Sequence, residues 1–190
     1  MMKLASHNSW SYLPPKKWWM RPFSFIAKCQ AKNIREQYEA GVRLFDLRVR
    51  FDKYGSPYVA HGLMEYDSDG LGADLRWLNN QLDVVYVQVI LEVGKENTLQ
   101  ENLFIAWCKK VKRRYKNIVF VGFNRKFDWK SLLNDKQGSM PIAGCFASAP
   151  SDKWYGKLND IFPWLWAKLH NKEVLEAYND YEGWVMMDFV

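Results

Sequence analysis

The sequence predicts an α/β protein built as a small, irregular (β/α) barrel of the TIM type with mostly parallel strands. Strand-like and helix-like segments alternate along the 190 residues, which is typical of a parallel sheet covered by helices. No glycine-rich phosphate-binding loop follows any strand-like segment, and this disfavours a doubly wound nucleotide-binding sheet. Polar residues stand at the ends of several strand-like segments, where (β/α) barrels carry their functional groups. The chain contains neither a repeat nor a linker, so residues 1–190 are expected to form one domain.

Seven segments have the composition of β-strands. The clearest is 84–93, which is rich in valine, isoleucine and tyrosine. The other six are 3–6, 42–50, 58–60, 118–123, 142–147 and 183–189.

Helices are predicted where apolar residues recur every three or four positions. A helix over 24–40 ends at Gly41, and a helix over 98–115 ends in a run of lysines and arginines that suits a helix C-terminus. The remaining predicted helices are 70–81, one or two turns at 128–133, and 158–178 with a break at Pro163.

The strand-like segment 42–50 places two charged residues on one face. Successive side chains of a strand point to opposite sides, so Asp46 and Arg48 project together, with Leu44 before them and Arg50 after them. A dry core would make this pair costly, whereas the polar mouth of a barrel would accommodate it. The alternative is a buried ion pair that only tightens the fold.

Two of the three histidines come directly after strand-like segments. His7 follows 3–6 and His61 follows 58–60, while Arg48 and Asp188 lie at or near the ends of two others. Two histidines can divide phosphodiester cleavage between a general base and a general acid, and an arginine can hold phosphate oxygens by bidentate hydrogen bonds. A carboxylate behind a histidine sets its tautomer.

Each of these residues also has a purely structural interpretation. Either histidine can be a satisfied structural residue, and Asp188, which lies near the end of the sequence, can be a solvated terminus. The third histidine, His170, falls among lysines in a helical segment and is interpreted as a surface residue.

Composition narrows the expected partners and compartment. The net charge of +6 favours an anionic partner, although a basic run such as 109–114 is interpreted as a solvated helix face and no nucleic-acid-binding motif accompanies it. Cys29, Cys108 and Cys145 have no metal-ligand spacing and are expected to be reduced structural thiols. No signal-like or membrane-spanning stretch is recognised, so a cytoplasmic protein, peripheral at the membrane, is expected.

Three motifs together resemble one enzyme family. They are Ser6-His7-Asn8-Ser9, then, after a Gln-containing helix, Gly41-Val42-Arg43-Leu44-Phe45-Asp46-Leu47-Arg48, then Ala60-His61-Gly62. A final strand ending at Asp188 joins them. This pattern is similar to the catalytic X region of phosphatidylinositol-specific phospholipase C, and closest to its bacterial, metal-independent branch. The resemblance covers about residues 4–61 and returns at the last strand.

The resemblance implies a role for each matching residue. His7 would be the general base, oriented by Asp188; Arg48 would clamp the phosphate; His61 would be the general acid; and Asp46 would hold Arg48 or His61. In the metal-dependent eukaryotic branch, acidic residues at the positions of Asp46 and Arg48 bind calcium. Because Arg48 supplies a cation there, the resemblance implies that neither a metal nor another cofactor is required.

Two departures from the family bear on the reaction and on the substrate: the first concerns protonation of the leaving group, and the second concerns the head group. Bacterial relatives often have aspartate where Asn8 stands, and an amide can hydrogen-bond His61 or Arg48 without supplying charge. The predicted strand 142–147 carries no acidic residue, whereas the bacterial enzymes bind inositol hydroxyls there. The head group is therefore left open, and the predicted substrate-binding residues are Asn8, Glu92, Lys95 and Arg125.

Aromatic and basic residues alternate in two segments. Such mixtures favour the membrane–water interface and anionic lipid. The predicted membrane-interface residues are Lys16, Lys17, Trp18, Trp19, Arg21, Phe23, Trp164 and Trp166. The alternative for the Trp18–Trp19 pair is packing into the open end of the barrel or a dimer contact.

The sequence thus predicts a phosphodiesterase that cleaves a phospholipid head group through two histidines and an arginine, with a cyclic phosphate as product. Two alternatives remain: a phosphodiesterase for another head group, such as a glycerophosphodiester or a sphingolipid, and a non-catalytic lipid- or inositol-phosphate-binding protein on the same fold.

Overall fold

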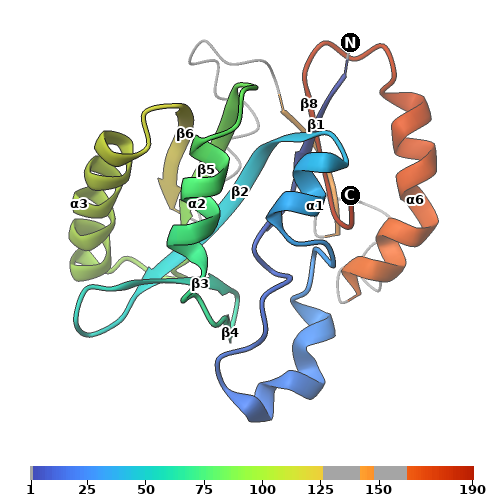
Figure 1. Cartoon of the computed structure of the whole chain (residues 1–190). Helices are drawn as coiled ribbons and strands as arrows, with labels where there is room; N and C mark the ends of the chain where they lie inside the picture. The colour runs from blue at the N-terminus through green and yellow to red at the C-terminus, as the bar shows by residue number, and fades with distance from the viewer. Residues whose placement is uncertain (1, 126–141, 148–161) are drawn as a thin grey trace.

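The computed structural model describes residues 2–125, 142–147 and 162–190. Their strands form one mixed eight-stranded sheet that curls into part of a barrel, with the helices around it (Figure 1). The predicted fold class, an α/β barrel with mostly parallel strands, is confirmed. The strands are β1 Lys3–Ser6, β2 Val42–Phe51, β3 Pro57–His61, β4 Met64–Glu65, β5 Val85–Leu91, β6 Ile118–Arg125, β7 Ile142–Cys145 and β8 Trp184–Met187.

Six strands run parallel in the order β6-β5-β2-β1-β8-β7. The long strand β2 occupies the middle: its residues Leu44 and Phe45 pair with β1 on one edge and with β5 on the other. Beyond the end of β1, the antiparallel strand β3 pairs with β2 from Val49 onward, and β4 completes a short hairpin. The carboxyl end of β2 is therefore flanked by the loop that leaves β1 and by the hairpin that carries His61.

The observed helices correct the predicted helix over 24–40. In place of one helix over 24–40, the 3₁₀ helix η1 covers Trp18–Ile26 and the α-helix α1 covers only Ile34–Glu39. Asn33 begins α1 through a capping box, in which its side chain accepts from the amides of Arg35 and Glu36 while Glu36 accepts from the amide of Asn33. Apolar spacing cannot reveal such a start, because the cap is a local polar interaction.

The other helices follow the predictions more closely. Helix α2 covers Leu71–Asn79, and α3 covers Thr98–Arg114 with its basic residues in the last turn. Helix α6, Pro163–Ala177, begins at Pro163 instead of being broken there, since proline suits the first turn, where its missing N–H costs nothing. The predicted turns at 128–133 and the start of the last predicted helix, 158–161, lie outside the described residues. None of the helices described here is both long enough and apolar enough to span a bilayer.

The two faces of β2 pack against two different apolar clusters. Phe45, Leu47 and Val49 face the helices and belong to the large core that includes α2 and α3. Leu44, on the opposite face, packs inside the barrel in a small apolar cluster with Ala5, Phe146, Trp184 and Met186. Asp46 and Arg48 are the next two residues on this inner face, so the apolar cluster ends where the polar site begins.

Candidate active site

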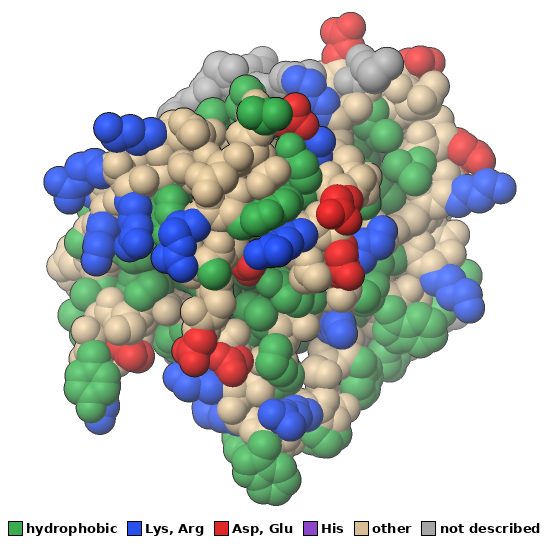
Figure 2. Space-filling model, viewed as in Figure 1, with side chains coloured by type: hydrophobic (Ala, Val, Ile, Leu, Met, Phe, Trp, Pro, Cys, Tyr) green, Lys and Arg blue, Asp and Glu red, His purple; other side chains and the backbone are tan. Residues whose placement is uncertain are grey.

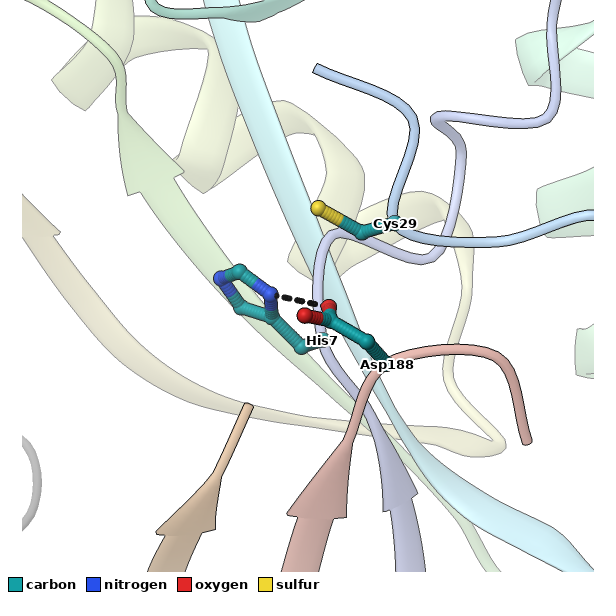
Figure 3. Close-up of side chains that lie close together, drawn as sticks. All are labelled: His7, Cys29 and Asp188. Atoms are coloured by element: carbon teal, nitrogen blue, oxygen red, sulfur yellow. Dashed lines mark hydrogen bonds and ion pairs between the residues drawn. The ribbon is translucent and has the colours of Figure 1, made fainter. Parts of the chain in front are cut away.

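His7 and Asp188 meet because β1 and β8 are adjacent parallel strands. Ser6 is in register with Met187, so the next residue of each strand leaves the sheet at the same point. His7 Nδ1 lies 2.7 Å from Asp188 Oδ1, and both side chains are buried (Figure 3). The second carboxylate oxygen of Asp188 accepts from the amide of Ala147 at 3.0 Å. Asp188 is therefore a buried partner of His7, and its interpretation as a solvated terminus is wrong.

Arg48 connects three of the predicted residues. Its Nε donates to Asp46 Oδ2 at 2.9 Å, and its Nη2 lies 2.7 Å from His7 Nε2. The buried carboxylate of Glu92 adds a third contact, with Oε2 3.5 Å from Arg48 Nη1. Burial by itself would lower the pKa of Arg48, but the charges of Asp46 and Glu92 outweigh it and raise the pKa, so the guanidinium stays charged. The predicted pairing of Asp46 with Arg48 is confirmed, and it is an ion pair that also contacts a histidine.

These contacts define the protonation state of His7. A guanidinium can only donate, so His7 Nε2 accepts from Arg48 and the ring proton resides on Nδ1. Asp188 then accepts at both oxygens, as an ionised carboxylate does, although its burial raises its pKa. Burial, followed by the charges of Arg48 and His61, holds the pKa of His7 well below 6.5. His7 is thus a neutral imidazole whose basic nitrogen faces Arg48.

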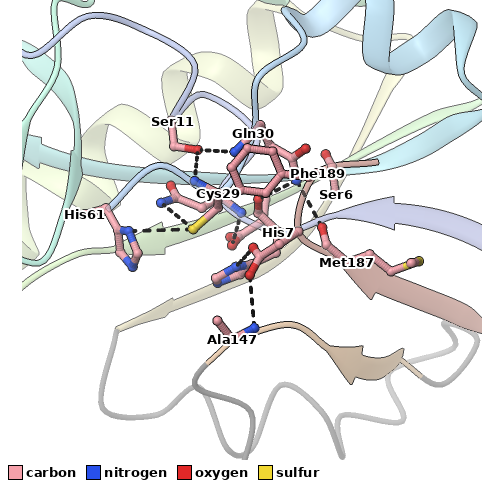
Figure 4. Close-up of polar contacts among 12 residues, drawn as sticks. Ser6, His7, Ser11, Cys29, Gln30, His61, Ala147, Met187 and Phe189 are labelled. Carbon is pink, nitrogen blue, oxygen red and sulfur yellow. Dashed lines mark hydrogen bonds and ion pairs between the residues drawn. The ribbon is translucent and has the colours of Figure 1, made fainter. Parts of the chain in front are cut away.

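His61 lies beside this group. Its ring centroid is 6.0 Å from that of His7, with the two planes nearly perpendicular. His61 Nδ1 lies 3.1 Å from the carbonyl oxygen of Ala27 and 4.0 Å from Cys29 Sγ (Figure 4). A carbonyl only accepts, so Nδ1 carries a proton and Nε2 is the nitrogen that gains or loses one. The structure therefore brings all five predicted catalytic residues to one end of the sheet.

Asn8 occupies a strained backbone position at the turn out of β1. Its φ of 47° lies in the left-handed region, which asparagine tolerates better than most residues. Its amide donates to Asp46 Oδ2 at 3.0 Å. The turn out of β1 is therefore held by the carboxylate that also pairs with Arg48. Its side-chain Nδ2 lies 3.8 Å from Cys29 Sγ, a contact that the sequence did not predict.

The other predicted substrate-binding residues lie in different surroundings. Glu92 is buried behind Arg48, and its Oε1 accepts from the amide of Gly62 at 2.9 Å, which links the His61 hairpin to the arginine. Lys95 is exposed in the turn after β5. Arg125 ends β6, and its side chain lies outside the described residues.

Most of the predicted membrane-interface residues form one surface, which we name the η1 patch. Trp18 is 77% exposed and Trp19 53%, so packing of this pair into the barrel is wrong. Phe25 of η1 stacks on Phe162 at the start of α6, with centroids 5.8 Å apart. Figure 2 shows hydrophobic side chains with lysines and arginines beside them at the bottom, where η1 lies in Figure 1. The patch consists of the exposed residues Lys16, Lys17, Trp18, Trp19, Arg21, Phe23, Phe25, Ile26 and Trp164.

Trp166 does not belong to the η1 patch. It is partly buried against the cluster of Val185 and Met187, and its ring lies 5.1 Å from that of His170. Helical spacing explains this, since Trp164 and Trp166 lie on different sides of α6. Among the predicted membrane-interface residues, Trp166 is the one that the structure places partly inside the protein.

Three residues that the sequence analysis did not place in the site complete it. Phe146 stacks on the ring of His7 at 3.8 Å between centroids. Gln30 is buried and donates through Nε2 to the carbonyl oxygens of His7 and Met187, which binds the ends of β1 and β8 together (Figure 4). Cys29, buried next to Gln30, lies among His7, His61 and Asp188. No sequence motif marks them, because they lie in irregular segments or at a strand end.

Comparisons with known proteins bear on the fold. No protein-family model matches the chain, and no curated protein does. Among solved structures, a phosphatidylinositol-specific phospholipase C mutant from Staphylococcus aureus is 15% identical, with a TM-score of 0.66 over 98% of this chain and 85% of that one. The corresponding enzyme from Listeria monocytogenes is 13% identical, with a TM-score of 0.64 over 98% and 87%. The chain therefore has the barrel fold of the bacterial phosphatidylinositol-specific phospholipases C.

Proposed function

We propose that this protein is a member of the phosphatidylinositol-specific phospholipase C family, on its bacterial, metal-independent branch, and that it cleaves a phospholipid head-group phosphodiester. The observation that carries the proposal is the meeting of two imidazoles and one guanidinium: Arg48 Nη2 lies 2.7 Å from His7 Nε2, and the His61 ring lies 6.0 Å from the His7 ring. Such a set is sufficient for general acid–base catalysis with a phosphate clamp.

In the proposed reaction a hydroxyl next to the phosphate is the nucleophile. His7 Nε2 takes the hydroxyl proton as the oxygen attacks phosphorus, and Asp188 stabilises the imidazolium that forms. Arg48 turns from His7 to the non-bridging oxygens and neutralises their charge. Protonated His61 donates to the departing oxygen as its bond to phosphorus breaks. The products are a cyclic phosphate and a free alcohol, diacylglycerol when the substrate is a glycerolipid.

The direct test is turnover of a panel of phosphodiesters with the products identified. We expect cleavage of phosphatidylinositol or another phospholipid head group, with a cyclic phosphate formed and the rate unchanged by a chelator. A glycerophosphodiester or sphingolipid as the only substrate would favour the alternative head groups. Lipid binding that survives His7→Ala, without turnover in the wild type, would favour the non-catalytic protein. Activity lost to a chelator and restored by calcium would contradict metal independence.

The low pKa of His7 predicts where activity falls in acid. The base works unprotonated, so kcat/KM rises as pH passes upward through the pKa of His7, which lies well below 6.5. The acid limb of a bell-shaped profile is therefore expected below pH 6.5, and the alkaline limb reports loss of the His61 proton. A kcat/KM profile from pH 4 to 9 measures both limbs. A single sigmoid, with His61→Ala nearly as active as the wild type, would rule out a two-histidine mechanism.

The η1 patch predicts peripheral binding to anionic membranes. It adjoins the site, because the carbonyl oxygen of Ala27, at the end of η1, contacts His61. Burial of a large apolar side chain contributes about 1.5–3 kcal/mol. Trp18→Ala/Trp19→Ala should therefore weaken binding to phosphatidylglycerol-containing vesicles at least about tenfold in a sedimentation assay. Leu82→Ala/Val84→Ala, which removes two exposed apolar residues just before β5, is the matched control. Equal binding by the tryptophan variant and the wild type would refute the interface.

A further inference from the structure

Cys29 is a buried thiol that the proposed reaction does not use. Its Sγ lies with His7 and Asp188 in a group of three metal-ligating side chains, whose ligand atoms are all within 4.8 Å of one another (Figure 3). Thiolate, imidazole and carboxylate are the donors that Zn²⁺ takes in proteins. The three residues come from separate segments of the chain, which is why spacing along the sequence did not reveal them.

The position of Cys29 is held by its backbone. Its amide donates to Ser11 Oγ at 2.9 Å, and its carbonyl oxygen accepts from the amide of Phe189, next to Asp188, at 2.8 Å. The segment that carries the thiol is thus tied to the strand end that carries the carboxylate. Tetrahedral zinc with bonds of about 2.0–2.3 Å needs ligand atoms roughly 3.3–3.8 Å apart. Sγ must move by up to about 1 Å to enter that range. His7 Nδ1 and Asp188 Oδ1, which are 2.7 Å apart in a hydrogen bond, must separate by about 0.6 Å when the metal replaces the proton between them.

A nearby amide offers a fourth ligand. Asn8 Nδ2 lies 3.8 Å from Cys29 Sγ, and Asn8 Oδ1 is buried without a hydrogen-bond partner among the described residues. A half-turn of the amide exchanges the two atoms and places an oxygen beside the sulfur. Water would otherwise complete the tetrahedron.

We propose that His7, Cys29 and Asp188 form an inhibitory site for a thiophilic divalent cation, Zn²⁺ or its analogue Cd²⁺. The metal forms bonds to His7 Nδ1, Cys29 Sγ and an oxygen of Asp188. The thiol proton of Cys29 is released to solvent, and the imidazole proton of His7 moves from Nδ1 to Nε2. His7 then has no lone pair for a substrate proton, and Arg48 loses its acceptor there. The inhibitory consequence rests on the proposed function, but binding of the metal does not.

The binding test uses absorption by cadmium–thiolate bonds. In a Cys108→Ser/Cys145→Ser protein, Cys29 is the remaining thiol. We expect one equivalent of Cd²⁺ to produce thiolate-to-metal absorption, and Cys29→Ser on that background to abolish it. His7→Gln and Asp188→Asn should each weaken the affinity at least about tenfold, which a site made by the thiol alone would not show. No absorption in the folded protein, or unchanged affinity in both ligand variants, would overturn the site.

The activity test then separates the site from the reaction. Micromolar Zn²⁺ should inhibit the wild type and the Cys108→Ser/Cys145→Ser protein equally, with reversal by chelator, while Cys29→Ser should need at least about tenfold more Zn²⁺. If Cys29→Ser does not fold, Cys29→Ala takes its place, with the thermal unfolding midpoint as the check. Equal inhibition with and without the Cys29 thiol would contradict the proposal. If no phosphodiester is cleaved, the proposed function fails and cadmium absorption alone decides the metal site.

Discussion

Replacement of His7 with glutamine should lower phosphodiester turnover by about 10²–10⁴-fold, the usual contribution of a general base. The reason is geometric: His7 Nε2 faces Arg48, and Nδ1 is held by Asp188 at 2.7 Å, so the basic nitrogen is directed to where a phosphate would bind. The measurement is kcat on the phosphodiester that the wild type cleaves best. Glutamine keeps a polar side chain next to Asp188, which limits the structural damage.

His170→Gln is the matched control for this variant. His170 lies on α6 and faces Glu173 on the surface, with Nδ1 3.9 Å from its carboxylate, so its replacement should leave kcat within about twofold of the wild type. Circular dichroism checks that both variants fold. Retention of more than a tenth of wild-type activity by His7→Gln would remove His7 from the role of base.

A double mutant tests whether Asp188 acts through His7. Asp188→Asn can still accept from His7 through its one oxygen, but its NH2 then faces the amide of Ala147, and the charge that stabilises the imidazolium is lost, so the variant should lower kcat on its own. Residues that act as one unit are not additive. The kcat of His7→Gln/Asp188→Asn should therefore lie within about twofold of the kcat of His7→Gln. Full multiplication of the two effects would indicate that Asp188 has a separate role.

Replacement of Arg48 with glutamine should give the largest loss of stability. Arg48 is buried between Asp46 and Glu92, and removing one partner of a buried ion pair costs about 3–5 kcal/mol because the other charge is left uncompensated. The free energy of unfolding from urea denaturation measures this cost. Turnover should also fall by about 10²–10³-fold, the effect of removing one donor to a developing oxyanion.

Arg43→Gln on the same strand is the control for Arg48→Gln. Arg43 pairs with Asp83, which is more than half exposed, and solvent screens such a pair, so its loss should change the free energy of unfolding much less than the loss of Arg48. Both arginines pair with an aspartate, so the main difference between them is that the Arg48 pair is buried. A similar loss of stability in both variants would contradict the interpretation of Arg48 as a buried, compensating cation.

The stability lost in Arg48→Gln should depend on pH. Burial already raises the pKa of Asp46, and the charge of Arg48 opposes that rise. Without Arg48 the folded-state pKa of Asp46 moves further above its unfolded value of about 3.9. A carboxylate whose pKa is raised by folding costs stability when it is ionised. The difference in the free energy of unfolding between wild type and Arg48→Gln should therefore be largest near neutral pH and become smaller as pH falls through the raised pKa. Urea denaturation at pH 7 and pH 5 measures the change.

The sequence was sufficient wherever a local rule applied. Asp46 and Arg48 share a face because strand side chains alternate, and their ion pair is confirmed. Helices α2 and α3 follow from apolar spacing along a continuous segment. The prediction of one helix over 24–40 was wrong because residues 27–33 end one helix and begin another. The polar side-chain interactions that cap the second helix do not alter the apolar spacing from which the prediction was made.

The amino-acid sequence by itself determined which chemistry-bearing residues stand at strand ends and which pairs share a strand face. Only the tertiary structure decided which of them meet. His7 and Asp188 lie 181 positions apart and touch because β1 pairs with β8, while Cys29 and Phe146 join them from segments without a recognisable motif. Strand order and register depend on the burial of both sheet faces by the whole chain, and no local pattern contains that information.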